Sequence, residues 1–199
     1  LIIKWRRNTV PKKAIFTKEQ IFKKAFEVFK QNGLEAITAR NLAKSLNSSP
    51  APIYSFYTSL DILKKDLINK AKDVFMEYVK KPTTEYIFLN IGIGVCMFAR
   101  EEKQLFHTIF LKDTSYSGLV REFRDLIKVE MSKDSRFDKL DEEFKTKLFL
   151  DCWMYAHGFS TLIATNYFKD VSDDFIKERL VEGAATMLYK RLRDYNKKN

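Results

Sequence analysis

The sequence has few of the residues that build catalytic centres. Its two histidines, His107 and His157, are fifty positions apart on separate predicted helices, without the spacing of a metal-ligand pair. The chain has no nucleophile-elbow sequence, no glycine-rich phosphate loop and no HExxH-type motif. We therefore expect no enzyme, and we assign no catalytic residue, metal ligand or cofactor.

Cysteines and long hydrophobic runs are also scarce. Cys96 and Cys152 are 56 positions apart in apolar stretches, which favours buried, reduced thiols over a disulfide framework or a metal site. No run of 18 apolar residues occurs, so no membrane span is predicted. The first seven residues lack the apolar core of a signal peptide. Together these absences predict a cytoplasmic protein with no membrane partner.

Proline is confined to the first 82 residues, and 117 residues follow the last of the four prolines. No apolar-polar alternation bounded by Asn-Gly or Asp-Gly turns indicates a strand. Apolar residues recur at helical spacing instead, which predicts an all-α fold. One helix is expected from near Thr17 to Asn32-Gly33, and a longer one over 60–80 follows the capping residue Ser59. Five more are expected at 84–100, 102–112, 116–132, 140–168 and 173–196.

Residues 38–63 form the most informative segment. Thr38 is expected to cap one short helix, and Asn47 to form a turn, because asparagine tolerates the left-handed conformation. Ser49 can then cap a second short helix with Pro50 at its first position. Two such helices joined by a tight turn predict a helix-turn-helix, whose second helix enters a DNA major groove. The apolar side of that second helix is assigned to Ile53, Tyr54 and Tyr57.

Positive charge is concentrated on the same part of the chain. Residues 1–81 contain 17 lysines and arginines against 7 acidic residues, whereas residues 82–199 contain 19 of each. A localised basic surface is typical of phosphate binding, since neutralised phosphates release condensed counterions. The alternative is a solvated lysine surplus without a nucleic-acid partner. We divide the chain into a basic arm and helix-turn-helix domain over 1–63 and a helical ligand-binding and dimerisation domain over 64–199, connected by the helix at 60–80.

The last two predicted helices are candidates for a subunit interface. Residues 148–168 are apolar almost all round, and Gly183-Ala184-Ala185 allows another helix to approach closely. A four-helix bundle with a symmetry mate would bury both, and the alternative is burial against their own domain. The predicted interface residues are Tyr155, Phe159, Leu162, Ile163, Val181, Ala184, Ala185 and Leu188.

Aromatic residues are frequent in the segment 85–160. Aromatic side chains with scattered polar groups line typical apolar ligand pockets, although at helical spacing they also form ordinary cores. Each histidine likewise fits either a ligand contact or a satisfied core residue. The predicted ligand-binding residues are Cys96, Phe106, His107, Phe110, Phe123 and Trp153.

The segment from Ile37-Thr38-Ala39-Arg40 through Ile53-Tyr54-Ser55-Phe56-Tyr57, with Leu63 following, resembles the DNA-binding domain of the tetracycline-repressor (TetR/AcrR) family of bacterial regulators. The resemblance covers about residues 15–65, and the helical remainder is similar more loosely to that family's ligand-binding domain. It implies a homodimer that binds a palindromic operator and releases it when a small molecule occupies the C-terminal domain. The chain departs from the family at Asn47, where glycine is common, and at Leu60, where lysine is frequent. It also has Phe56 where a histidine or tyrosine is usual.

The resemblance also implies individual roles for residues of this segment. Thr38 and Tyr54 resemble phosphate-contacting positions. Lys64 is one of the cations nearest to Leu60, the position where the family frequently has a lysine. The positions that resemble base-facing or adjacent backbone-facing ones are Arg40, Ser49, Pro50, Ala51 and Ser55. Arginine can bridge guanine O6 and N7, while alanine and proline offer apolar surface to thymine methyls. The basic arm Lys4–Lys13 could reach a flanking minor groove. The alternative for Arg40 is a solvated charge on a helix.

We therefore predict a ligand-responsive transcriptional repressor that binds double-stranded operator DNA as a homodimer and releases it with a small apolar effector. One alternative is a DNA-binding protein of the same fold that is controlled by a protein partner. The other is an α-helical enzyme, which the charge asymmetry and the missing catalytic groups disfavour.

Overall fold

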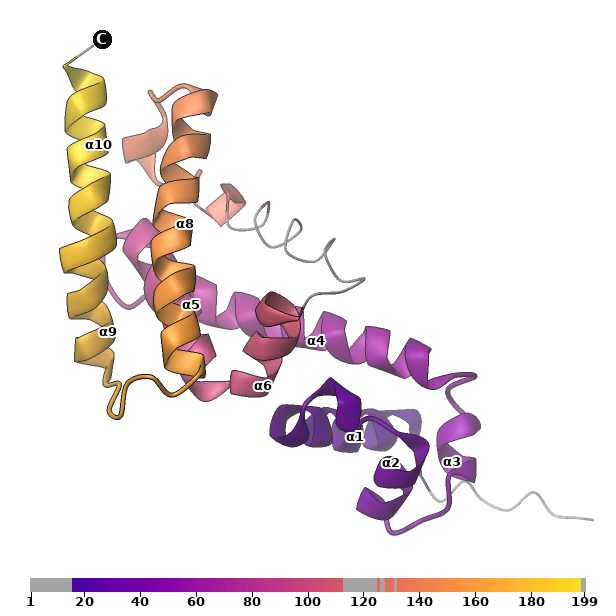
Figure 1. Cartoon of the computed structure of the whole chain (residues 1–199). Helices are drawn as coiled ribbons and strands as arrows, with labels where there is room; N and C mark the ends of the chain where they lie inside the picture. The colour runs from indigo at the N-terminus through magenta and orange to yellow at the C-terminus, as the bar shows by residue number, and fades with distance from the viewer. Residues whose placement is uncertain (1–15, 113–124, 126–127, 131, 198–199) are drawn as a thin grey trace, which may run out of the picture.

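The computed structural model describes residues 16–112, 125, 128–130 and 132–197. Every regular element within these residues is a helix, which confirms the all-α prediction (Figure 1). Among the helices described, none combines the length and the apolar character needed to cross a membrane.

Three helices form the N-terminal group. Helix α1 (Lys18–Asn32) begins at a capping box, in which the Thr17 hydroxyl accepts from the Gln20 backbone N–H and the Gln20 side chain accepts from the Thr17 N–H. It ends at Gly33, whose φ of 81° favours glycine. After a 3₁₀ turn η1 (Leu34–Ala36), α2 (Ala39–Ser45) and α3 (Ala51–Tyr54) follow. Thr38 caps α2 as predicted, through a bond from the Asn41 N–H.

Helix α4 (Leu60–Lys80) connects this group to the rest of the molecule (Figure 1). Ser59 caps it, and its bounds match the predicted helix at 60–80. The main hydrophobic core runs along α4 and joins residues from α1 through α8, so no break in the core separates the two proposed domains. Helix α5 (Ile87–Glu101), almost wholly buried in its second half, packs across the C-terminal half of α4.

The close contact of α4 with α5 depends on Gly94. A Cβ atom at this position would lie 2.3 Å from the Tyr78 carbonyl oxygen and 2.8 Å from the Val79 Cα, and backbone atoms cannot move aside as a flexible side chain can. At Gly92, on the same helix, a Cβ would meet only the Leu180 side chain at 3.4 Å, an ordinary contact.

We expect Gly94→Ala to lower the free energy of unfolding by at least about 1–3 kcal/mol, through overpacking between α4 and α5. The matched control Gly92→Ala should instead leave it unchanged or raise it by up to about 1 kcal/mol, because alanine favours the helix. Urea denaturation of both variants measures the difference. Equal stability of the two variants would contradict the close packing of these helices.

One predicted helix of the middle segment differs from expectation, and a second is not tested. The element expected at 102–112 is a short helix α6 (Lys103–Phe106) that continues as a π-helical turn η2 (His107–Leu111). The helix expected at 116–132 lies largely outside the described residues. A 3₁₀ turn η3 (Ser135–Phe137) precedes the C-terminal helices.

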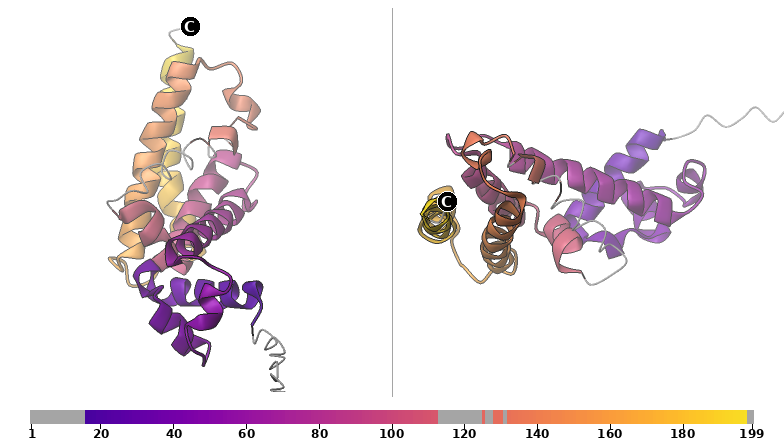
Figure 2. Two further views of the ribbon diagram at one scale, coloured as in Figure 1. Left: turned by 90° about the vertical axis from the view of Figure 1, so that its right-hand side faces the viewer. Right: turned by 90° about the horizontal axis from the view of Figure 1, so that it is seen from above.

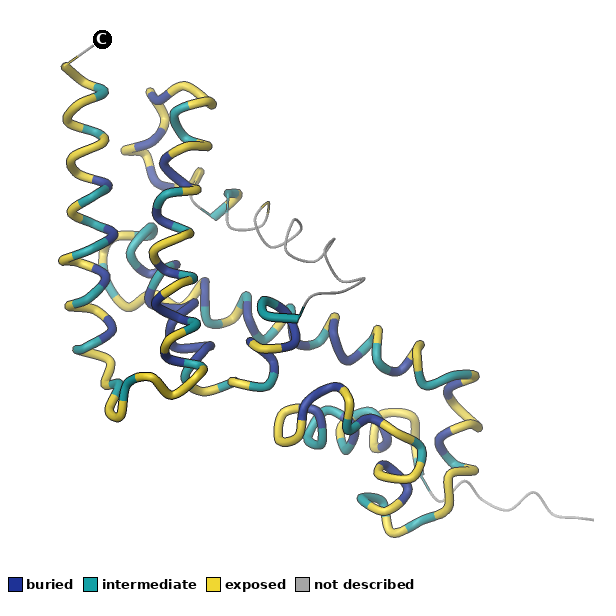
Figure 3. Tube along the Cα trace, in the orientation of Figure 1, coloured by how far each residue is buried: buried dark blue, intermediate teal, exposed yellow. Residues whose placement is uncertain are grey.

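The C-terminal part is an antiparallel pair of long helical segments, seen side by side in Figures 1 and 2. Helix α8 (Glu142–Ala164) forms the first, and α9 (Asp173–Leu180), η4 (Val181–Ala185) and α10 (Thr186–Asn196) together form the second. The prediction had extended α8 to residue 168. The helix ends earlier because Asn166 adopts a φ of 60°, which a right-handed helix excludes. In Figure 3 the α10 end is mostly exposed, with Leu188 as its buried residue.

Candidate functional site

The turn between α2 and α3 has the conformation that the sequence predicts. Asn47 adopts a φ of 48°, in the left-handed region, and the Ser48 N–H donates to the Ala43 carbonyl at 2.9 Å. Leu42 and Ile53, one from each helix, are fully buried against the core. The two helices are thereby fixed relative to α1 and α4, at the end of the molecule remote from α8 and α10 (Figure 1).

The outer side of this pair carries the residues predicted to contact DNA. Seven of the eight are exposed, namely Thr38, Arg40, Ser49, Pro50, Ala51, Tyr54 and Ser55, whereas Lys64 on α4 is half-buried. Two details of the prediction were wrong. Tyr54 is 50% exposed and does not belong to the apolar side of α3, which Ile53 and the following Tyr57 form alone. Pro50, not Ser49, precedes the first residue of α3, and no side chain caps that helix.

Unpaired positive charge accompanies this surface. Among the described residues, Arg40 and Lys44 on α2 and Lys65 on α4 have no acidic partner within ion-pair distance. Two nearby carboxylates are already paired, Glu27 with Lys24 and Glu35 with Lys112. The cations of α2 are therefore free to meet an external anion. The basic arm Lys4–Lys13 lies outside the described residues.

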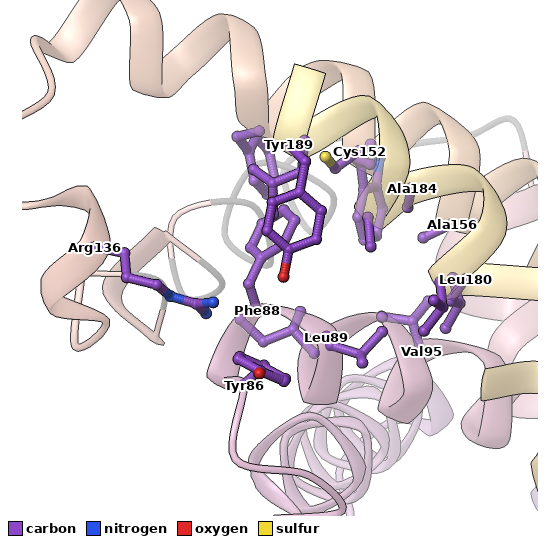
Figure 4. Close-up of a pocket in the computed structure, with 17 residues that line it drawn as sticks. Tyr86, Phe88, Leu89, Val95, Arg136, Cys152, Ala156, Leu180, Ala184 and Tyr189 are labelled. Atoms are coloured by element: carbon purple, nitrogen blue, oxygen red, sulfur yellow. The ribbon is translucent and has the colours of Figure 1, made fainter. Parts of the chain in front are cut away.

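A second candidate site is a cavity in the C-terminal half, about 160 Å³ in volume (Figure 4). Three walls enclose it: α5, α8, and the segment from the end of α9 through η4 to the start of α10. Its lining is almost entirely apolar, with Val95 from α5, Trp153 and Ala156 from α8, and Leu180 and Ala184 from the C-terminal segment. Such a concave, apolar space is typical of a small-molecule site.

Polar groups occur at one end of the cavity, where Tyr86, Arg136 and Tyr189 line it. In Figure 4 the Arg136 side chain reaches toward Tyr86, and the Tyr189 hydroxyl points from α10 toward α5. The Arg136 guanidinium lies 4.9 Å from the centre of the Tyr86 ring, a cation–π distance. Its Nε donates to Asp134 at 2.8 Å, and its Nη2 forms an ion pair with the same carboxylate.

Of the five described residues that were predicted to bind a ligand, only Trp153 lines this cavity. Cys96 is fully buried elsewhere, where its sulfur accepts from the Ser160 hydroxyl at 3.4 Å. Phe106 and Phe110 pack against each other, and His107 is exposed on η2. Phe123 lies outside the described residues. Sequence reasoning missed Tyr86, Arg136 and Tyr189, because two of them lie outside the long helices and nothing in the sequence indicates their proximity.

The histidine that joins the aromatic cluster is His157, not His107. Its ring lies 5.4 Å from that of Trp153 and 5.8–6.0 Å from those of Phe110 and Phe106. The buried Nδ1 has no hydrogen-bond partner. Burial lowers the pKa of His157, because the cluster offers nothing to solvate an imidazolium.

This lowered pKa predicts a pH-dependent stability. Because unfolded His157 binds a proton more tightly than folded His157, the free energy of unfolding should fall as pH drops below about 6.5. Urea denaturation between about pH 7.5 and pH 5 measures this dependence. His157→Gln should reduce it, while the control His107→Gln, which removes an exposed imidazole, should retain it. An identical pH profile for the wild type and His157→Gln would contradict the assignment.

The predicted interface residues divide into two sets. Phe159, Ile163, Ala184 and Leu188 are buried within their own protomer, so the expectation that they face a partner was wrong. Tyr155, Leu162 and Val181 are 37–43% exposed, and Ala185 lines the cavity. The Tyr155 hydroxyl is engaged within the chain, donating to the Arg179 carbonyl at 2.8 Å.

An apolar row on α8 is exposed, and it includes Leu162 of the predicted interface residues. Leu150, Met154, Gly158 and Leu162 recur every four residues and are all exposed, the three large side chains by 39–56%. An apolar row of this length on a helix is unusual for a surface without a partner. Within the described chain, α8 is thus buried on one side and exposed on the other, and the expected burial of its second side stays a prediction.

The described residues give little indication of metal binding or of a reactive thiol. No group of three or more His, Cys, Asp or Glu side chains there could hold a metal ion. Cys96 and Cys152 are both free and buried, and burial raises the pKa of each thiol to about 12. Neither protein-family models nor curated proteins give a match to this chain. The function is therefore argued from the two sites.

Proposed function

We propose that this chain is a ligand-responsive transcriptional repressor that binds DNA as a homodimer through a helix-turn-helix formed by α2 and α3. The observation that carries the proposal is the two-sided arrangement of this pair. Its inner side is buried, with Leu42 and Ile53 fully enclosed, while seven residues with the chemistry of DNA contacts are exposed together on α2, α3 and the turn. A fixed helix pair with a polar, basic outer side is the geometry that DNA major grooves accept.

In this proposal α3 enters the major groove and α2 crosses the phosphate backbone. Arg40 reaches a base edge or the adjacent phosphate, and the exposed Tyr54 hydroxyl donates to a phosphate oxygen. Helix α3 has only four residues and begins with Ala51 and Pro52, so it can make few direct base contacts. Specificity therefore depends partly on DNA shape.

The second copy docks, in this proposal, on the exposed row of α8. A dimer places two α3 helices in successive major grooves, about 34–36 Å apart, which one chain cannot do. The row at Leu150, Met154 and Leu162 supplies apolar area for this contact, and Gly158 lets the partner helix approach.

A ligand in the cavity would act through Trp153. This ring lines the cavity and lies 5.8 Å from that of Phe110, which lies 5.2 Å from Phe75 on α4. The two residues that flank the α6–η2 segment also contact the N-terminal group by ion pairs, Glu102 with Lys30 and Lys112 with Glu35. The ligand alters DNA affinity only to the extent that it prefers one arrangement of these helices over the other.

The cavity also bears on the alternative of control by a protein partner. A filled C-terminal core with an exposed apolar groove would favour that alternative, whereas an apolar cavity favours a small-molecule sensor. The structure has such a cavity, so the sensor is the better supported of the two.

Selection from a random pool of DNA duplexes with the purified chain tests this function. We expect enrichment of a palindromic sequence with half-sites about one helical turn apart. Enrichment of no sequence, together with weak binding at low salt, would contradict the proposal.

A further inference from the structure

We propose that the cavity between α5, α8 and the η4–α10 segment binds a compact apolar carboxylate, with its chain against α5 and α8 and its carboxylate at Arg136. Only the effect of ligand binding on DNA affinity rests on the proposed function. The assignment of the ligand class itself comes from the lining of the cavity.

The body of the ligand must be apolar and small. The walls provide Val95, Trp153, Ala156, Leu180 and Ala184, with no charged side chain among them (Figure 4). A volume of about 160 Å³ is close to that of apolar cavities that hold a single benzene ring, about 150 Å³. The space therefore suits one ring or a chain of roughly eight carbons, and not a large polycyclic drug.

The polar end of the cavity is a cluster of hydrogen-bond donors. Arg136 carries five N–H groups, and Asp134 accepts from only its Nε and Nη2 side, which leaves the Nη1 edge available. Tyr189, 58% exposed, adds a hydroxyl directed toward α5. Cation–π contact with Tyr86 and the ion pair with Asp134 hold the guanidinium in place before any ligand arrives.

This cluster selects for an anionic group. No carboxylate is among the residues that line the cavity. The two nearby ones are already engaged, Asp134 by Arg136 and Glu85 by the Tyr86 hydroxyl, so a ligand ammonium would have no free counter-charge. A carboxylate would accept charge-assisted bonds from Nη1 and from the Tyr189 hydroxyl, which are stronger than bonds to a neutral alcohol or ester. The ion pair with Asp134 also means that the Arg136 charge is not isolated beside an apolar wall.

Isothermal titration calorimetry of the full chain, without DNA, tests the ligand class. The probes are octanoate, 1-octanol and octylammonium, with hexanoate and dodecanoate as a length series. We expect octanoate to bind at least tenfold more tightly than 1-octanol, and octylammonium not to bind. Affinity should rise about fourfold per methylene from hexanoate to octanoate, and the gain should cease before dodecanoate, because the cavity is then full. Equal affinity for octanoate and octanol, or no binding of octanoate, would overturn the proposal.

Two variants locate the site. Asp134→Asn/Arg136→Gln removes both charges together, so that neither is left unpaired, and should abolish the preference of octanoate over octanol. Ala185→Phe fills the cavity from η4 and should abolish binding of both probes, with circular dichroism confirming that each variant is folded. A folded double variant that keeps the tenfold preference would place the carboxylate elsewhere and overturn the assignment.

A separate experiment measures DNA binding with and without octanoate. A chain that binds octanoate and no DNA supports the ligand assignment and overturns the proposed function. A chain that binds operator DNA and no carboxylate overturns the ligand assignment alone.

Discussion

Raising the salt concentration from about 50 to about 200 mM should weaken operator binding by roughly 10³-fold, the effect expected when about six phosphates are neutralised. The physical reason is counterion release at a surface where Arg40, Lys44 and Lys65 have no acidic partner among the described residues. Fluorescence anisotropy with a labelled operator duplex measures the slope of log affinity against log salt. Affinity that does not depend on ionic strength would contradict a phosphate-binding surface.

Arg40→Ala separates base contact from phosphate contact within the same experiment. If Arg40 reaches a base edge, the variant should lose about 1–3 kcal/mol and relax the preference at one base position. Tyr54→Phe should weaken binding to all sequences alike, because it removes one phosphate donor. The matched control Arg193→Ala removes an exposed arginine from α10, remote from α2 and α3 in Figure 1, and should leave binding unchanged. Equal losses of binding free energy for Arg40→Ala and Arg193→Ala would indicate that Arg40 is a solvated charge and contacts no base.

Charge on the exposed face of α8 should dissociate the dimer and lower operator affinity by about 10²–10⁴-fold, the range lost when two linked binding sites act singly. Met154→Glu and Leu162→Glu are the test variants, because both side chains are exposed in the protomer, by 56% and 39%, and neither belongs to a hydrophobic cluster of the described core. Sedimentation at micromolar protein concentration measures the oligomeric state, and anisotropy measures the affinity.

The control variant is Tyr167→Glu, which places the same charge on a side chain 71% exposed beyond the end of α8. It should remain dimeric. Charge at Ala184 would not be informative, because that side chain is buried within the protomer and its replacement would destabilise the fold itself. A wild-type chain that sediments as a monomer and still binds a palindromic site with unit stoichiometry would defeat the dimer proposal.

The sequence by itself determined the local elements. Thr38 and Ser59 cap the helices that they were predicted to cap, the first helix begins next to Thr17 as expected, and Asn47 turns the chain in the left-handed region. These features depend on residues within about four positions of each other, since a cap or a turn is satisfied by its own backbone neighbours.

Tertiary structure alone decided which faces of the C-terminal helices are buried and where the cavity lies. Phe159 and Leu162 are three positions apart on one apolar helix, yet the first is buried and the second exposed, because α5, α9 and η4 cover the side of α8 that carries Phe159 and leave Leu162 uncovered. Tyr86, Arg136 and Tyr189 are at least fifty positions apart in the sequence and meet only when α5, η3 and α10 converge. Apolar periodicity indicates that a helix has a face to bury but not which neighbour covers it, and a cavity is the space that several such neighbours fail to fill.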